Sequence, residues 1–150
     1  MTPIFVSRIY FVLLLFVLSL DVLAQDKGGG PLENTTIGFH LGSVHSATGY
    51  NDFNPGVYIK FQNNITFGNY YNSNYHQSTY AGYTYAYNNN IDITTGLITG
   101  YQIYRYTPLL IPSYKFPNLI DAVTLRVAFI PRFFGVVQAN VIHAMVETNF

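Results

Sequence analysis

Cysteine and tryptophan are both absent from the 150-residue sequence, and charged residues are scarce. Without cysteine, the chain has neither the disulfides that stabilise many small exported domains nor a thiolate metal site. Charged residues make up 9% of the chain, against roughly 25% in ordinary soluble domains. The net charge is zero and the lysines and arginines are scattered, so the sequence offers no basic patch for nucleic acid.

The first residues of the chain look like an export signal. Arg8 precedes the apolar run Ile9 to Leu20, and small residues stand just before Gln25. The run is shorter than the roughly 20 apolar residues that cross a bilayer, and no cysteine follows it for a lipid anchor. We expect residues 1–24 to be a cleaved signal peptide, with a retained anchor as the alternative. Residues 25–35 then form a short flexible segment, and residues 36–150 form one domain.

From residue 36 onward, apolar and polar side chains alternate in eight short segments separated by clusters of Asn, Gly, Pro and Ser. Alternation with a period of two is typical of strands, whose side chains point to opposite faces in turn. In the tyrosine-rich segment, Tyr83, Tyr85 and Tyr87 share one face, while Gly82 and Thr84 share the other. The pattern predicts an all-β fold, an eight-stranded antiparallel up-and-down β-barrel.

Two kinds of barrel fit this pattern: a secreted lipocalin-like barrel that is apolar inside, and an outer-membrane barrel that is apolar outside. The minor face is rich in Gly, Thr, Asn, His and Arg, which suits a narrow polar lumen better than a solvated exterior. Aromatic residues gather near segment ends, as in the girdles of membrane barrels. We therefore expect an outer-membrane barrel of a Gram-negative envelope.

The last residue, Phe150, closes an alternating segment, which resembles the C-terminal signature of bacterial outer-membrane proteins. We expect this strand to meet the barrel-assembly machinery, and the barrel to be a monomer among phospholipid and lipid A. With both ends in the periplasm, the connections alternate between its two sides. Periplasmic turns are expected at 63–64, 88–90 and 117–121, and extracellular loops at 46–54, 74–78, 102–107 and 132–136.

The polar residues of the minor face are the first candidates for chemistry. None of the four histidines has the close spacing of a zinc helix, so we expect neither a metal site nor a cofactor. His143 and Glu147 fall on the lumen face, with Arg126 on the neighbouring strand. Charges inside a barrel are usually paired, so we expect these three to form a polar network that fills the lumen.

Several segments resemble the bacterial outer-membrane lipid A palmitoyltransferases, the PagP-type enzymes. Residues 70–85 are similar to their active-site segment, an Asp-Ser pair before an aromatic loop and an Ala-Gly-Tyr-Gly-aromatic strand. Here the pair is Asn72-Ser73 and the strand reads "AGYTY". "TTIGFH" resembles the segment that ends in the family's essential histidine and points to His40, and "GYNDFNPGVY" resembles its Tyr-Asn-acid-x-Pro-x-Gly stretch. "YTPLLIP" and "VAFIP" match its proline-bearing strands.

The resemblance implies an enzyme that moves a palmitoyl chain from a phospholipid to a hydroxyl-bearing acyl group of lipid A, with the active site facing outward. It makes His40 the general acid or base and places Asn72 and Ser73 near the oxyanion. It also implies an acyl pocket in the lumen at Gly82 and Thr84. The prolines that would break ladder pairing and open the wall to lipids are Pro55, Pro108, Pro112 and Pro131.

Three features depart from the family pattern. Asn72 replaces an acid and so cannot stabilise a histidine as a carboxylate does. Thr84 replaces the glycine of the pocket floor, and the family's N-terminal amphipathic helix has no counterpart in "KGGG". A non-catalytic outer-membrane barrel is therefore the alternative, an envelope or phage-exclusion protein or a phage-borne relative.

Two histidines on the first strand compete for the catalytic role. His40 has the lumen-facing parity, whereas His45 lies nearer the rim with lipid-facing parity. His45 would turn inward only if a bulge changed the register, so we expect His40 to be the catalytic histidine. On this expectation, His40→Ala abolishes activity and His45→Ala leaves most of it.

Overall fold

The computed structural model describes residues 33–101, 104–120, 123–132 and 138–150. The predicted signal peptide and most of the segment 25–35 lie outside this range. In the described part of the chain, no helix is long and apolar enough to cross a membrane. The strands are β1 (Thr36–His45), β2 (Phe53–Lys60), β3 (Ile65–Tyr71), β4 (Gln77–Ala86), β5 (Ile91–Ile98), β6 (Thr107–Ile120), β7 (Val123–Ile130) and β8 (Val141–Asn149).

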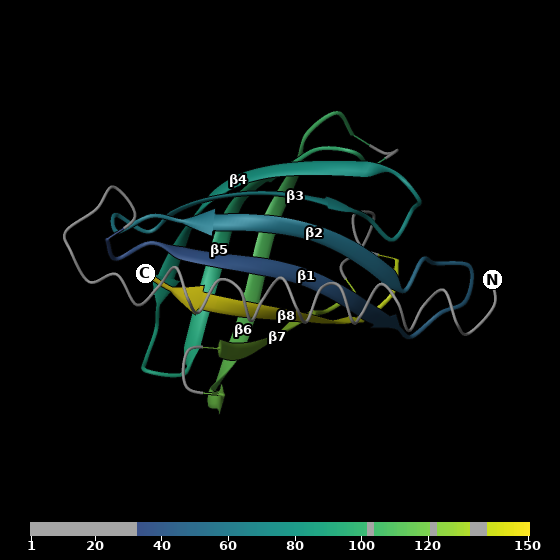
Figure 1. Ribbon diagram of the computed structural model, residues 1–150. Helices are drawn as coiled ribbons and strands as arrows, with labels where there is room; N and C mark the ends of the chain where they lie inside the picture. Colours follow the sequence, from purple (N-terminus) through teal and green to yellow (C-terminus); the bar gives the residue numbers. More distant parts are fainter. Residues whose placement is uncertain (1–32, 102–103, 121–122, 133–137) are drawn as a thin grey trace. The chain divides into compact units, whose positions relative to one another are not determined.

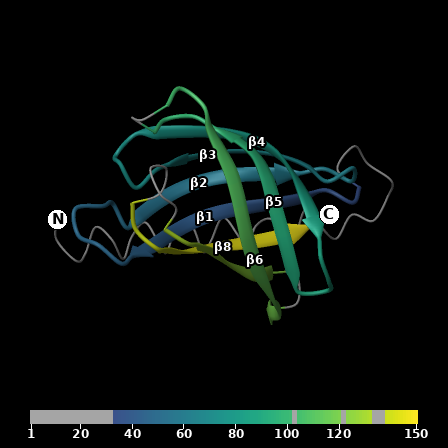
Figure 2. The ribbon, with the colours of Figure 1, turned by 180° about the vertical axis from the view of Figure 1, so that it is seen from behind.

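Each strand pairs with its neighbours in chain order, and β8 returns to pair with β1 (Figure 1). The predicted all-β fold, a closed barrel of eight antiparallel strands, is confirmed. One end of the barrel carries the connections β1–β2, β3–β4, β5–β6 and β7–β8, and we call it the loop end. The other end carries the remaining connections, and we call it the turn end. Figure 2 shows β4, β5 and β6 from the opposite side.

The two faces of the wall differ as the alternation predicts. On β4, the outward-facing Tyr83 and Tyr85 are 48% and 57% exposed, whereas the inward-facing Thr84 is buried. Arg126 and Glu147 are also buried inside the barrel. Polar and charged side chains therefore point into the lumen, and large apolar side chains point outward. A lipocalin-like barrel would have the opposite arrangement.

Tyrosine rings fill much of the lumen, and glycines make room for them. Tyr58 pairs across strands with Gly38, and Tyr80 pairs with Gly68. A Cβ atom on either glycine would collide with the facing ring, so each ring lies against bare backbone. The resulting core contains Tyr58, Tyr80, Ile98, Ala128 and Met145, with Tyr70, Tyr101, Leu109 and Ile111 packed against it. The tyrosine-rich segment thus serves both faces, with some rings in the lumen and others outside.

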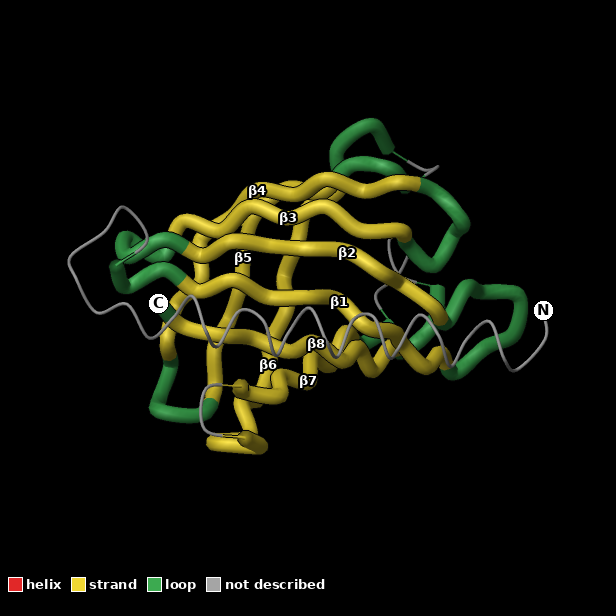
Figure 3. Tube along the Cα trace, in the orientation of Figure 1, coloured by secondary structure: helices red, strands yellow, loops and turns green. Residues whose placement is uncertain are grey.

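Two of the predicted turns match the structure, while most of the predicted loop 132–136 and part of the loop 102–107 lie outside the described residues. The predicted turns at 63–64 and 88–90 do separate strands, and Figure 3 shows the connections as loops between the strands. The turn predicted at 117–121 comes later than expected, because β6 continues to Ile120, which pairs with Val123, and the connecting residues 121–122 lie outside the described range. Pro117 falls inside a register shift between Phe116 and Ile120. Proline cannot donate to the ladder, and here it interrupts the pairing without ending the strand.

A β-bulge in β1 decides where the end of that strand points. His40 and Gly42 pair with Met145 and Ala144, which are adjacent on β8, so Leu41 is an extra residue. Beyond a bulge, side chains exchange faces. The lipid-facing parity expected for His45 is therefore wrong, and the side chain of His45 is only 2% exposed.

Candidate active site at the loop end

Ser73, His45 and Asp52 form a hydrogen-bonded chain at the loop end of the barrel. His45 Nε2 lies 2.7 Å from Ser73 Oγ, and His45 Nδ1 lies 2.8 Å from Asp52 Oδ1. The imidazole is covered, while the Asp52 side chain is 69% exposed. This is the geometry of a catalytic triad, in which a carboxylate orients a histidine that accepts the proton of a serine. We call these three residues the triad.

The three members come from three separate parts of the chain. His45 is the last residue of β1, Asp52 immediately precedes β2, and Ser73 follows β3. The Asn51 N–H donates to the carbonyl oxygen of Ser73 over 2.9 Å, and the Ser43 N–H donates to that of Asp52 over 2.8 Å. These backbone bonds hold the β1–β2 connection against the loop that carries Ser73 and against the part of β1 that ends in His45.

Tyr50 covers the histidine of the triad. Its ring stacks on the His45 imidazole, with the centroids 4.8 Å apart and an angle of 20° between the planes. The Tyr50 hydroxyl donates over 3.3 Å to Oε1 of Gln138, which lies in the β7–β8 connection. Tyr50 therefore limits the access of water to the imidazole and restricts its rotation.

Asn72 precedes Ser73 but takes no part in the triad. It is completely buried, and Nδ2 donates to Ser78 Oγ and to the Gly100 carbonyl, both over 2.9 Å. Its Oδ1 accepts the N–H groups of Asn74 and His76 over 2.8 and 3.0 Å. All four bonds fix the β3–β4 connection. The structure therefore makes Asn72 an organiser of the loop that carries Ser73.

Restoring an acid at position 72 is expected to lower stability without raising activity. In Asn72→Asp, the two donated bonds are lost and a carboxylate faces Ser78 Oγ and the Gly100 carbonyl. Each lost bond that leaves a buried group unsatisfied costs about 1–3 kcal/mol. Urea unfolding of the detergent-solubilised barrel should show this loss, whereas Asn63→Asp, in an exposed turn, should change the free energy of unfolding by about 0.5 kcal/mol or less. Higher activity in Asn72→Asp would show that the position is catalytic.

His40 lies inside the lumen, away from the serine with which it was expected to act. Its Nδ1 lies 2.8 Å from His143 Nε2, and its Nε2 lies 3.2 Å from the Tyr80 hydroxyl. Its ring also stacks on Tyr70 at 4.8 Å. Both ring nitrogens already have partners, and the structure brings His45, not His40, to Ser73. A catalytic role for His40 stays a prediction, but the structure gives His40 no contact with Ser73 and gives His45 one.

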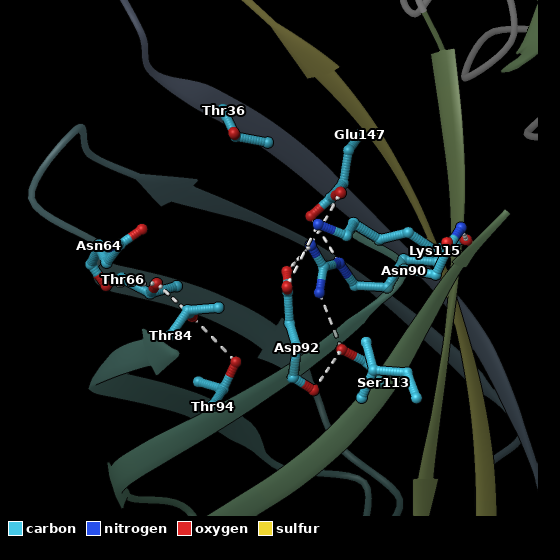
Figure 4. A network of polar contacts seen from close by, with 12 residues as sticks. Thr36, Asn64, Thr66, Thr84, Asn90, Asp92, Thr94, Ser113, Lys115 and Glu147 are labelled. Carbon is cyan, nitrogen blue, oxygen red and sulfur yellow. Dashed lines mark hydrogen bonds and ion pairs between the residues drawn. The ribbon is translucent and has the colours of Figure 1, made fainter. Parts of the chain in front are cut away.

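A buried charge cluster fills the turn-end half of the lumen. Arg126 Nε and Nη2 donate to the two carboxylate oxygens of Glu147 over 2.6 and 3.0 Å. Nη2 also lies 2.7 Å from Asp92 Oδ2, and Nη1 donates to Ser113 Oγ over 2.8 Å. Figure 4 shows Asp92, Ser113 and Glu147 pointing toward one another inside the barrel, with Lys115 beside them. The expected pairing of Arg126 with Glu147 is confirmed, but His143 pairs with His40 instead.

The two residues expected at the acyl pocket lie on the lumen face of β4. Gly82 pairs with Gly96 across the ladder. Thr84 Oγ1 bonds with Oγ1 of Thr66 over 2.8 Å and with Oγ1 of Thr94 over 2.9 Å, forming a row of hydroxyls across three strands (Figure 4). Their role as a pocket floor stays a prediction.

Among the described residues, no group of three or more His, Cys, Asp or Glu is placed to hold a metal ion.

Two of the expected prolines lie in the part of β6 that pairs with β5 but not with β7. Pro108 and Pro112 pair with β5, but the pairs between β6 and β7 begin only at Ser113 and Ala128. Residues 107–112 therefore pair on one side only, and we call this part of the wall the β6–β7 seam. Pro55 lies in a similar position on β2, whose pairs with β3 begin at Gly56. Pro131 follows the last residue of β7.

Comparison with known proteins adds nothing to this geometry. The chain matches no protein-family model, and a search of curated proteins found no match either.

Proposed function

We propose that this chain is an outer-membrane lipid acyltransferase in which the triad moves an acyl chain from a phospholipid to lipid A. The observation that carries the proposal is the contact of His45 with both Ser73 and Asp52 at the rim of an apolar-faced barrel. A serine, a histidine and a carboxylate joined in this order are the groups that nucleophilic acyl transfer requires. In this proposal Asp52 is the carboxylate that orients the catalytic histidine, the role that the family pattern gives to an acid at position 72.

The exterior of the barrel supports a lipid environment. Large apolar side chains point outward from every part of the wall and stay exposed, and very few charges interrupt them. A surface of this kind on a soluble monomer would promote aggregation, whereas acyl chains solvate it. Examples among the exposed residues are Val57, Phe67, Leu97, Leu110 and Phe129. We place the barrel in the outer membrane with its loop end outward, inserted by the barrel-assembly machinery through the β8 strand and Phe150.

The proposed reaction has two steps that use the same groups. Ser73 Oγ attacks the ester carbonyl of a phospholipid while His45 Nε2 takes its proton, and the proton passes to the lysophospholipid alcohol as the C–O bond breaks. A hydroxyl of lipid A then attacks the acyl-Ser73 ester and gives its proton to His45. The imidazolium returns this proton to Ser73 Oγ as the second C–O bond breaks. Asp52 keeps the imidazole in the tautomer that can accept a proton at Nε2.

Mass spectrometry of lipid A from cells that produce the protein tests this proposal. We expect one additional acyl chain per acceptor molecule with the wild-type chain and none with Ser73→Ala. Heat-modifiable migration on a gel should show equal insertion of both proteins. Unchanged lipid A beside a fully inserted wild-type barrel would contradict the proposal.

The tyrosine-filled lumen favours one other candidate, a non-catalytic barrel of the envelope or a phage-exclusion protein. Tyr70 and Tyr101 join their hydroxyls over 2.9 Å, and Tyr80 packs nearby, so an acyl chain can enter only by displacing rings. In this case Ser73→Ala would preserve the phenotype of the wild-type protein, such as phage resistance.

A further inference from the structure

The His45 imidazole needs a support besides the two hydrogen bonds of the triad. Its bond with the Ser73 hydroxyl is lost once that oxygen carries an acyl chain, because the next proton then comes from the acceptor alcohol. The bond with Asp52 remains, but the carboxylate is 69% exposed and water competes for it. A ring held by one such bond can rotate away from the serine, and a misplacement of about 1 Å costs up to about 10²-fold in rate.

Tyr50 gives the imidazole this support. The ring planes of Tyr50 and His45 differ by 20°, and their centroids are 4.8 Å apart, so the phenol lies along one face of the imidazole. A ring in this position blocks rotation toward that face and leaves the contacts of both nitrogens intact. The stack does not involve Ser73 Oγ, so acylation of the serine leaves it in place.

Tyr50 also begins a run of three residues that each contact a different part of the site. Tyr50 covers the imidazole, the Asn51 N–H donates to the carbonyl oxygen of Ser73 over 2.9 Å, and Asp52 bonds with His45. The backbone that carries the phenol is therefore fixed against the loop of the serine.

A contact from another connection holds the far end of the Tyr50 side chain. Its hydroxyl donates to Gln138 Oε1 over 3.3 Å. Two residues after Gln138, the Asn140 N–H donates to Ser46 Oγ and the Asn140 carbonyl accepts the Ser46 N–H, both over 2.9 Å. These bonds join the residue that precedes β8 to the residue that follows β1. Tyr50 is thus attached through its backbone to the β3–β4 connection and through its hydroxyl to the β7–β8 connection.

We propose that Tyr50 is a positioning residue of the triad, which holds the His45 imidazole in the orientation that presents Nε2 to Ser73, and that Gln138 assists it through the phenol hydroxyl. The inference rests on the proposed function, in which Ser73 is the nucleophile. It gives a role to the tyrosine of the Tyr-Asn-acid stretch, of which the proposed reaction uses only the acid.

The kinetics of Ser73 labelling by a fluorophosphonate probe test this role in the full detergent-solubilised barrel. We expect Tyr50→Leu, which removes the ring, to lower the maximal labelling rate constant at least about 10-fold and to change the half-saturating probe concentration less than about twofold. Tyr50→Phe keeps the ring and loses one exposed hydrogen bond, so it should lose about threefold or less, and Gln138→Ala should match it. Tyr104→Leu, which removes another exposed tyrosine of the loop end, should leave labelling unchanged. Partial misfolding of a variant lowers the labelled fraction but not the rate constant of the inserted molecules.

NMR of protein labelled with ¹⁵N-histidine gives a readout that does not depend on catalysis. The His45 Nδ1 proton faces Asp52 under the Tyr50 ring, and its signal is assigned by its absence in His45→Ala. We expect a resolved signal in the wild-type protein and in Tyr50→Phe. In Tyr50→Leu, faster exchange with water should broaden it.

The outcomes separate this inference from the acyltransferase proposal. Equal rate constants or equal imidazole signals in the wild-type protein and Tyr50→Leu would overturn the role of Tyr50 and leave the triad. A loss in Tyr50→Phe as large as that in Tyr50→Leu would also overturn it, because the hydroxyl and not the stacked ring would then be required. Labelled Ser73 beside unmodified lipid A would reject lipid A as the acceptor and leave the role of Tyr50 intact. A wild-type serine that is never labelled would reject both.

Discussion

Ser73→Ala and His45→Ala are each expected to lower acyl transfer by at least about 10²-fold, the lower end of what a general acid–base group contributes. Ser73 supplies the attacking oxygen, and His45 is the base that lies 2.7 Å from it. Mass spectrometry of lipid A acyl chains, normalised to the amount of inserted barrel, measures the effect. A fluorophosphonate probe offers a second readout, since it should label Ser73 in the wild-type protein and fail to label the His45→Ala variant.

His40→Ala is the control that separates the two histidines. His40 bonds with His143 and Tyr80 inside the lumen, so its loss is expected to lower stability and to keep most of the activity. If activity survives in His45→Ala and disappears in His40→Ala, the triad has no catalytic role. Asp52→Asn should have a smaller effect than His45→Ala, because the exposed carboxylate is screened by water.

The sequence predicts the strand count and the faces of the wall because both depend on local alternation. Thr84 and Tyr85 differ in exposure as their parity requires, and Arg126 and Glu147 meet because both have lumen parity on adjacent strands. The face on which His45 lies depends instead on the bulge at Leu41, which is set by how β1 pairs with its neighbouring strands. Alternation along the segment itself does not show where such a bulge falls.

The missing acid has a different explanation. Asp52 lies in "GYNDFNPGVY", a stretch that the resemblance marks, but the family pattern places its acid at position 72. Only the fold shows that the β1–β2 connection reaches the loop that carries Ser73, through the bond from Asn51 to Ser73. An acid near the serine in space therefore replaces one beside it in sequence. β6 is longer than the sequence predicts for a related reason, since a proline such as Pro117 predicts the end of a strand, whereas β6 continues past it.

Arg126→Met is expected to destabilise the barrel by about 3–5 kcal/mol, which is the usual cost of removing one partner from a buried ion pair. Arg126 is 4% exposed and bonds with both Glu147 and Asp92, so methionine leaves Glu147 without its ion pair and Asp92 with the pair to Lys115. The chain has no tryptophan, so unfolding in urea is best followed by the shift of the folded band on a gel or by circular dichroism.

The triple variant Asp92→Asn/Arg126→Met/Glu147→Gln identifies the cause of that loss. Replacing the partners of a buried ion pair together with neutral residues is often close to neutral in stability, because the desolvation cost disappears together with the attraction. Lys115 stays charged in this variant, but its side chain is 24% exposed and can turn to water. We therefore expect the triple variant to recover most of the stability that Arg126→Met loses. If it stays as unstable as the single variant, the Arg126 side chain stabilises the barrel by packing instead of by charge. Recovery would mean that Arg126→Met loses stability because it leaves the carboxylates of Asp92 and Glu147 buried without their guanidinium partner, and that charge pairing at these positions is needed only while the acids are present.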